Sequence, residues 1–320
     1  MIRIATVGTS VITESLIGAV SRTPGVEVVA VSSRDDERAR AYADRVGVRG
    51  AYGSLDALLG AGEVDAVYIA SPNSVHAEQV AAAIDAGKHV LVEKPAVGTA
   101  EEWNALTERA RRAGVVLLEA MRSAYDPGLH AVRDELASLG ELRRASLHYA
   151  KRSSRYDAVL AGETPNIFDP AMGGGALADL GVYVVHAAML LFGEPVSVRA
   201  SSVPIATGVD GAGVALLEYP GFVVDVSYSK ITTSTRPSEI AGEVATLEID
   251  HLPGPRRLVR TGADGSSSER MVEGAADSLD GEVARFVELV EERGGAEEDQ
   301  ARTAATLRTI ERIRAVQSPR

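Results

Sequence analysis

The chain has 320 residues, which is enough for two domains of ordinary size. It is 45% hydrophobic and 24% charged, a balance that excludes disorder as the main state. The net charge of −12 makes nucleic-acid binding unfavourable, because an acidic surface repels a phosphate backbone. The absence of cysteine excludes disulfides, cysteine nucleophiles and thiolate metal sites, and we expect no metal centre.

The amino-terminal end shows no targeting signal. An apolar strand pattern at 2–7 follows Met1 directly, without the basic region and cleavage site of a secretory signal. No apolar stretch is expected to approach the roughly 18 residues that a membrane span requires. We therefore expect a cytoplasmic protein with no membrane partner.

Short apolar runs alternate with longer amphipathic ones up to about residue 119. Strand–helix alternation with short turns is typical of a parallel sheet wound by right-handed crossovers, so residues 1–121 are predicted to form an α/β domain. Glycines stand where four of the helices should end, a common helix C-cap signal. The expected strands are 2–7, 26–31, 65–70, 89–92 and 115–119, the expected helices are 12–21, 37–46, 75–86 and 100–113, and the glycines are Gly25, Gly47, Gly87 and Gly114.

The pattern changes after residue 121. Several strand-like segments follow one another without helices between them, which indicates an α+β domain at 122–320 with a mainly antiparallel sheet. Pro220 and Gly221 predict a hairpin turn, and the segments 253–255 and 262–268 are expected to be surface loops. The expected strands are 142–152, 196–203, 213–219, 222–231 and 244–249, and the expected helices are 127–139, 176–192, 279–293 and 297–316, the last of which is expected to pack back on the first domain.

A phosphate-binding turn is predicted where the first strand meets the first helix. Dinucleotide-binding domains carry G-x-G-x-x-G/A at this place, and here Gly8 matches the first glycine while Ser10 and Thr13 occupy the other two positions. Free amides at a helix N-terminus hold phosphates well, although an ordinary turn is equally compatible with this motif alone. The predicted phosphate contacts are Gly8, Thr9, Ser10, Val11 and Ile12.

The end of the second strand favours NADP over NAD. NAD-binding domains place an acidic residue here for the ribose hydroxyl, whereas an arginine accommodates the extra phosphate of NADP. This chain has Ser33 and Arg34, with Arg38 one helical turn later. A hydroxyl and guanidinium groups suit a phosphate dianion, and NAD remains the alternative cofactor.

Two polar clusters follow neighbouring strands and should meet at the carboxyl edge of the sheet, where ligands bind. One contains Ser71, Pro72, Asn73 and His76, and the other is Glu93-Lys94-Pro95. Desolvation beside a cationic nicotinamide disfavours the charge of a lysine, which suits Lys94 to donate a hydrogen bond to a substrate oxygen. The alternative is an ordinary surface lysine.

Asp179, Tyr183 and His186 are spaced to share one face of a helix. A carboxylate, a phenol and an imidazole on one face could handle protons. For His186 by itself, a core position is the better interpretation, and its role stays open.

These motifs together resemble the Gfo/Idh/MocA oxidoreductases, over essentially the whole chain. The resemblance rests on Gly8-Thr9-Ser10, Ser71-Pro72-Asn73 with His76, Glu93-Lys94-Pro95, and Asp179-x-Gly181-x-Tyr183. It implies an N-terminal Rossmann domain and a C-terminal domain whose large open sheet forms a homodimer or homotetramer interface. It also implies that Lys94 lies beside the nicotinamide and the substrate hydroxyl.

The resemblance extends to the nature of the catalytic partner. Tyr183 places the chain in the tyrosine-type branch, with glucose–fructose oxidoreductase and dimeric dihydrodiol dehydrogenase, where relatives of the inositol dehydrogenase type have histidine. Arg122 matches a position near the nicotinamide. Order along the chain and family likeness also suggest three substrate contacts, Arg155, Tyr156 and Asn166.

The resulting hypothesis is an NAD(P)-dependent oxidoreductase acting on a hydroxyl or carbonyl carbon of a sugar, polyol or diol. Tyr183 would exchange the hydroxyl proton, Lys94 would polarise the same oxygen, and Asp179 would orient one of them. Two alternatives remain: a non-catalytic dinucleotide-sensing regulator, and a glycoside hydrolase that uses bound NAD for transient oxidation. A net change in nicotinamide absorbance with substrate would separate a dehydrogenase from the hydrolase.

Overall fold

The computed structural model describes residues 1–275 and 278–317, which form two compact units. We call the first, Met1–Met121 with Leu279–Ala304, the N-terminal unit. The second, Arg122–Ser278 with Ala305–Arg320, is the C-terminal unit. Helix α10 (Glu297–Val316) supplies residues to both units along its length.

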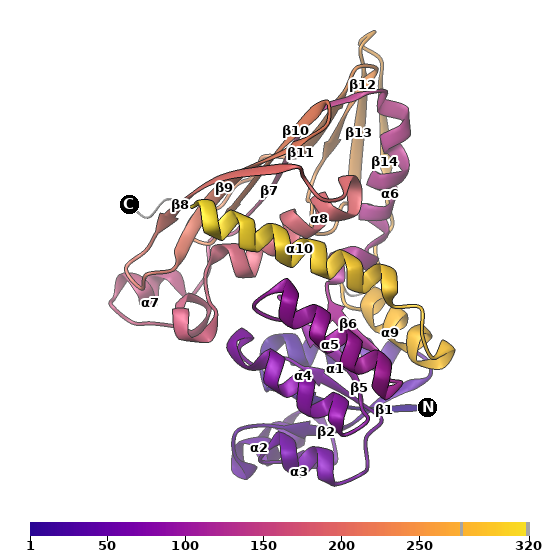
Figure 1. The fold of residues 1–320 in the computed structure, drawn as a ribbon, viewed down its shortest axis with the longest axis vertical. Helices are drawn as coiled ribbons and strands as arrows, with labels where there is room; N and C mark the ends of the chain where they lie inside the picture. Colours follow the sequence, from indigo (N-terminus) through magenta and orange to yellow (C-terminus); the bar gives the residue numbers. More distant parts are fainter. Residues whose placement is uncertain (276–277, 318–320) are drawn as a thin grey trace. The chain divides into compact units, whose positions relative to one another are not determined.

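The N-terminal unit is built on a six-stranded sheet in the order β3-β2-β1-β4-β5-β6, with every neighbouring pair parallel. The doubly wound α/β fold predicted for this part is confirmed (Figure 1). The strands run through the hydrophobic centre of the unit, and the four residues of β4 are all buried. Their bounds are Ile2–Val7 for β1, Val26–Ser32 for β2, Gly50–Tyr52 for β3, Ala66–Ile69 for β4, His89–Glu93 for β5 and Leu117–Ala120 for β6.

The helices of this unit have clear sequence signals at their ends. Helix α5 begins with a capping box, in which Thr99 and Glu102 each bond the other's backbone amide. It ends at Gly114, whose φ of 69° lies in the left-handed region that glycine adopts without strain. The helices are Val11–Arg22 (α1), Asp36–Val46 (α2), Leu55–Gly60 (α3), His76–Asp85 (α4), Ala100–Ala113 (α5) and Asp280–Glu292 (α9), with a short 3-10 turn, η1, at Asn73–Val75.

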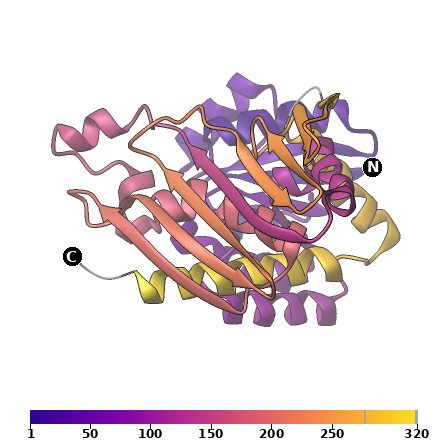
Figure 2. The same ribbon diagram turned by 90° about the horizontal axis from the view of Figure 1, so that it is seen from above.

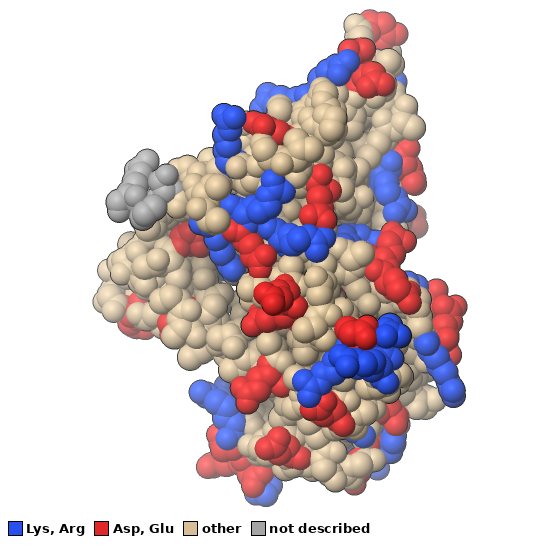
Figure 3. Space-filling model, viewed as in Figure 1, with Lys and Arg blue, Asp and Glu red and all other residues tan. Residues whose placement is uncertain are grey.

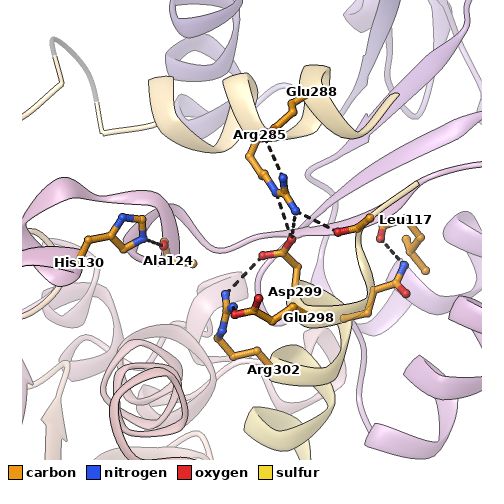
Figure 4. A network of polar contacts seen from close by, with 10 residues as sticks. Leu117, Ala124, His130, Arg285, Glu288, Glu298, Asp299 and Arg302 are labelled. Atoms are coloured by element: carbon orange, nitrogen blue, oxygen red, sulfur yellow. Dashed lines mark hydrogen bonds and ion pairs between the residues drawn. The ribbon is translucent and has the colours of Figure 1, made fainter. Parts of the chain in front are cut away.

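Polar contacts attach the last two helices to the edge of the sheet (Figure 4). Asp299 of α10 accepts from Arg285 of α9 at 3.1 Å and pairs with Arg302 at 3.4 Å. The side-chain amide of Gln300 donates to the carbonyl of Leu117 in β6 at 2.9 Å. The first turns of α10 are therefore bonded directly to the last strand of the parallel sheet.

The C-terminal unit contains an eight-stranded sheet in the order β14-β13-β12-β11-β7-β10-β9-β8 (Figure 2). Only β7 and β10 run parallel, so the prediction of a large, mainly antiparallel sheet is confirmed. Tyr219 pairs with Phe222, which confirms the hairpin turn at Pro220-Gly221. The strands are Leu142–Ala150 (β7), Ser197–Pro204 (β8), Asp210–Tyr219 (β9), Phe222–Ser229 (β10), Ser238–Gly242 (β11), Ala245–Ile249 (β12), Arg257–Gly262 (β13) and Ser267–Met271 (β14).

Some expectations for this unit were wrong in detail. The predicted loop at 262–268 includes the start of β14, and the expected helix at 127–139 is an α-helix, Pro127–Glu135 (α6), followed by a 3-10 turn, Leu136–Leu139 (η3). Between β7 and the central helix, the structure holds a short helix, Tyr156–Leu160 (α7), and two 3-10 turns, Asn166–Phe168 (η4) and Pro170–Met172 (η5), none of which the sequence analysis predicted.

The central helix of the C-terminal unit begins with a π-helical turn, Leu177–Gly181 (η6), and continues as Val182–Phe192 (α8). Helix α8 packs on β7 and β10. Contrary to our expectation of no span-length apolar stretch, Pro170–Phe192 is long and apolar enough to cross a membrane by length and composition alone. Of its most apolar 18-residue window, 78% is buried inside the structure, as in a core helix.

Charged side chains of both signs are interspersed over the visible face of the molecule (Figure 3). Many arginines take part in surface ion pairs, for example Arg143 with Glu243 and Arg257 with Glu269. Exposed pairs of this kind contribute little to stability, about 0–1 kcal/mol each. The arginines therefore need no functional explanation as a group.

Candidate active site

The turn after β1, predicted to bind phosphate, brings two backbone segments close together at Gly8. Gly8 has a φ of 114°, and a Cβ at this position would lie 2.5 Å from the carbonyl oxygen of Ala70. Only glycine fits such a close approach of two backbone segments. The side chain of Ser10, the N-cap of α1, accepts no hydrogen bond from a backbone amide of the helix, so the first helical amides keep their capacity for an anion.

The predicted arginine lies beside this turn. The Nε–H of Arg38 donates to the hydroxyl of Thr9 at 3.2 Å, across the pair of strands β1 and β2. Asp35 fixes the start of α2 by accepting from the backbone amide of Arg38 at 2.8 Å. Ser33 is half-buried and Arg34 is exposed at the end of β2. The structure thus brings Thr9 and Arg38 together, with the exposed Arg34 at the end of β2.

The ends of β4 and β5 are joined through a buried histidine. His76 is fully buried, with Nε2 at 3.0 Å from the carbonyl oxygen of Ser71 and Nδ1 at 3.1 Å from that of Pro95. Burial lowers the pKa of His76, because desolvation disfavours the imidazolium. His76 therefore connects two loops of the predicted cofactor site, and its ring lies inside the protein.

Lys94 lies directly after β5 and is half-buried, and its peptide bond to Pro95 is cis. The neighbouring Glu93 accepts hydrogen bonds from the hydroxyl of Tyr68 at 2.6 Å and from the backbone amide of Lys94 at 3.2 Å. Ser71, from the β4 loop, donates to Gln79 at 2.6 Å. The two polar clusters predicted for the carboxyl edge of the sheet therefore lie on neighbouring strands.

Glu119 is a buried acid near the predicted cofactor loops that the sequence analysis did not single out. It lies in β6, is 2% exposed, and accepts from the backbone amide of Ala96 and the hydroxyl of Thr303, each at 2.9 Å. Burial raises the pKa of Glu119 to about 7, because desolvation disfavours its ionised form. A single acid at the end of an apolar strand is the only sequence signal of this position.

Tyr183 of α8 is the centre of a second cluster, in the C-terminal unit. The Nε–H of Arg122 donates to the phenol oxygen of Tyr183 at 3.2 Å, and the guanidinium lies 5.2 Å from the ring centre. Tyr149 packs edge-on against the same ring, with centroids 5.8 Å apart. A guanidinium donating to a phenol oxygen stabilises negative charge that develops there. Arg122, expected near the nicotinamide, is thus a direct partner of the expected catalytic tyrosine.

Asp179 forms an ion pair with Lys230, a residue to which we had assigned no role. The Lys230 side chain is 6% exposed and that of Asp179 is 34% exposed, so the ammonium is buried while the carboxylate keeps some contact with solvent. Lys230 follows β10 and also lies 5.6 Å from the centre of the Phe168 ring. His186, further along α8, is 2% exposed.

The residues suggested as substrate contacts cluster around α7. Tyr156 packs on Phe168 with centroids 5.9 Å apart, while Arg155 and Asn166 are exposed. A cavity of about 350 Å³ lies elsewhere in the C-terminal unit, and its lining includes Tyr149, Lys151, Arg236 and His251. Tyr149 both lines this cavity and packs on the ring of Tyr183. Among the described residues, no group of three His, Asp or Glu side chains is placed to hold a metal ion.

Comparison with known proteins decides the family. Residues 2–121 match the Gfo/Idh/MocA oxidoreductase family with an NAD-binding Rossmann fold, and residues 132–248 match the C-terminal domain of the same family. The chain is 35% identical to a scyllo-inositol 2-dehydrogenase (NADP(+)), IolU, of Bacillus subtilis, over 98% of this chain and 96% of that protein. The chain belongs to the Gfo/Idh/MocA family.

Other members of the Gfo/Idh/MocA family agree with this assignment. Trans-1,2-dihydrobenzene-1,2-diol dehydrogenase of Mus musculus is 34% identical over 74% of this chain and 70% of its own. The solved structure of KijD10, a 3-ketoreductase from Actinomadura kijaniata in complex with NADP and TDP-benzene, has a TM-score of 0.89 at 26% identity and covers 99% of this chain and 98% of its own. The family resemblance stated from the motifs is confirmed, and with it an oxidoreductase with a nucleotide-binding Rossmann domain.

Proposed function

We propose that this protein is an NADP-dependent dehydrogenase or reductase that acts on a hydroxyl or carbonyl carbon of a sugar, polyol or diol. The relatives act on an inositol and a dihydrodiol, and the first of them is named for NADP. The observation that carries the proposal is the Arg122–Tyr183 contact, because a guanidinium that donates to the phenol oxygen stabilises negative charge developing there. A lysine at the end of β5 supplies the second polar group that the reaction needs.

The residues after β1 and β2 fit NADP. A Cβ at Gly8 would fill the space against Ala70, so the glycine keeps the backbone turn close and open to a pyrophosphate. The amides at the start of α1 would hold the phosphates, and Arg38 with Arg34 would hold the additional phosphate on the ribose. The nicotinamide would supply hydride chemistry when bound.

The chain's own residues divide the remaining work. Tyr183 exchanges the proton of the substrate hydroxyl, and Arg122 stabilises the charge that this exchange leaves on the phenol oxygen. Lys94 donates a hydrogen bond to the same substrate oxygen and polarises it. The half-buried cavity beside Tyr149 offers hydroxyl, imidazole and ammonium groups that suit the remaining hydroxyls of a polyol.

A panel of inositols, aldoses and diols assayed with NADP and with NAD tests the proposal. We expect substrate-dependent reduction of NADP, seen as a net change in nicotinamide absorbance. A protein that binds NADPH but turns over none of the panel in either direction would support the dinucleotide-sensing regulator. Cleavage of a glycoside without net absorbance change would support the NAD-dependent hydrolase.

Replacing Arg38 by alanine is expected to weaken NADP binding about 10–100-fold and to change NAD binding little. The expectation follows from losing a charge-assisted contact of about 1.5–3 kcal/mol to the additional phosphate. Arg40→Ala is the matched control, because Arg40 is an exposed arginine two residues further on α2. Titration of both cofactors by fluorescence measures the effect, and equal weakening of NADP and NAD would contradict the assignment.

We also propose that the protein is a homo-oligomer formed through the sheet face opposite α8. The register places Val203, Val214 and Val223 on that face, and they are 48%, 46% and 37% exposed. Val214→Glu is expected to reduce the solution mass to that of a single chain, because it places a charge in an apolar contact. Leu160→Glu on α7 is the control, since Leu160 is exposed away from the sheet. Light scattering after size exclusion measures the mass, and an unchanged oligomer in Val214→Glu would count against this interface.

A further inference from the structure

The peptide group that joins Pro95 to Ala96 is held at both of its polar ends by buried side chains. Its carbonyl oxygen lies 3.1 Å from Nδ1 of His76, and its N–H donates to Oε1 of Glu119 at 2.9 Å. His76 is fully buried and Glu119 is 2% exposed. One peptide unit, directly after Lys94-Pro95, is therefore bonded by two side chains from α4 and β6.

We propose that His76 and Glu119 are positioning residues that fix the Pro95–Ala96 peptide, and thereby hold Lys94 in its catalytic place. This inference rests on the role of Lys94 under the proposed function. In the tautomer with the proton on Nδ1, His76 donates to the Pro95 carbonyl, while Glu119 accepts from the Ala96 amide, and the two bonds together restrict rotation of the peptide. Displacing a catalytic group by about 1 Å can lower the reaction rate about 10²-fold, and the Lys94 ammonium is such a group under the proposed function.

Both holding groups are themselves fixed. The second oxygen of Glu119 accepts from the hydroxyl of Thr303 in α10 at 2.9 Å. Nε2 of His76 lies 3.0 Å from the carbonyl of Ser71, in the loop after β4. Breaking a buried polar contact leaves its partner unsatisfied, so the neighbours of Glu119 and His76 restrict their movement. The position of Lys94 thus depends on three neighbouring strands of the sheet, β4, β5 and β6.

The backbone before Lys94 is held in the same manner. The carboxylate of Glu93 accepts from the backbone amide of Lys94, and the fully buried Tyr68 donates to that carboxylate at 2.6 Å. The main chain around Lys94 is consequently bonded to side chains on both sides. A lysine side chain is long and flexible. The protein can therefore restrict the position of its ammonium mainly by fixing the backbone from which the side chain extends.

Isosteric variants separate this role from a general structural one. The side-chain amide of asparagine at position 76 can place an N–H donor where Nδ1 of the histidine lies. The longer side chain of glutamine places its amide where Nε2 lies instead. We therefore expect His76→Gln to lower kcat about 10²-fold with little change in NADPH affinity. The decrease in kcat for His76→Asn should be clearly smaller. Likewise, Glu119→Gln keeps an acceptor for the Ala96 amide and should lose far less kcat than Glu119→Ala.

A readout that needs no substrate is provided by the small number of lysines. The chain has only four, so ¹³C-methylated lysine resonances are few, and Lys94→Arg identifies the resonance of Lys94. We expect Glu119→Ala and His76→Gln to shift or broaden this resonance in the NADP-bound protein, while those of Lys88 and Lys151 stay in place. Thermal unfolding of each variant shows whether it is folded.

The outcomes are distinct. If the wild-type protein turns over no sugar, polyol or diol, the proposed function fails, and the lysine resonances still report whether the backbone is held. If His76→Gln and Glu119→Ala leave both kcat and the Lys94 resonance unchanged, the positioning role is wrong. If Glu119→Ala does not fold, the comparison of His76→Asn with His76→Gln decides, and equal loss of activity in these two variants overturns the proposal.

Discussion

Replacing Lys94 by alanine, or Tyr183 by phenylalanine, is expected to lower turnover by about 10²–10⁴-fold. Lys94 would polarise the reacting oxygen and Tyr183 would exchange its proton, so each variant removes a contribution made mainly in the transition state. Steady-state kinetics with the best substrate of the panel measures the effect on kcat and on kcat/KM. Binding of NADPH should be retained, since neither side chain belongs to the predicted phosphate site.

Matched variants show whether the losses are chemical. Lys88→Ala removes a lysine of the same unit whose ammonium donates to the carbonyl of Val64 at 2.8 Å. Lys88 precedes β5, so it lies away from the carboxyl ends of β4 and β5, where the site is predicted. Tyr52→Phe removes a tyrosine hydroxyl of the N-terminal unit that donates to Glu63 at 3.0 Å in an exposed contact. Full activity in both Lys94→Ala and Tyr183→Phe would refute the proposed chemistry, whereas loss of NADPH binding would indicate that a variant had disturbed the fold.

The sequence was sufficient for those parts of the fold whose burial is periodic. Strands β1, β4, β5 and β6 of the parallel sheet are short, apolar and mostly buried, so their pattern identifies them. Strand β14 has five exposed residues and β3 has only three residues, so neither carries a pattern that could predict it. Strand β14 is positioned by backbone pairing with β13, and β3 by pairing with β2. Backbone pairing does not produce a hydrophobic pattern in the sequence.

Some residues of the candidate site could likewise be predicted from the sequence, and others could not. Lys94 and Tyr183 stand in motifs, and their importance could be predicted from those motifs. The partner of Tyr183 could not, because Arg122 lies 61 positions away in the chain and is one of many arginines. Glu119 and Lys230 were missed because a lone acid or base at a strand end is ordinary, and only the folded structure shows that each is buried against a specific partner.

Breaking the ion pair between Asp179 and Lys230 is expected to lower the free energy of unfolding by about 3 kcal/mol. Removing one partner of a buried pair costs about 3–5 kcal/mol, and the low end applies because Asp179 is 34% exposed. Asp179→Asn leaves the Lys230 ammonium buried without its counter-charge. Urea unfolding of the full chain measures the loss, and Asp157→Asn, in an exposed pair with Arg152, is the control.

The double variant Asp179→Leu with Lys230→Met tests whether the pair serves stability or the site. Replacing both charges by apolar groups of similar size often restores stability, because neither charge then needs solvation. We expect most of the lost free energy of unfolding to return while turnover stays low, since the pair holds the π turn that leads directly into Tyr183. Recovery of turnover together with stability would show that Asp179 contributes only to folding, and would remove it from the catalytic group.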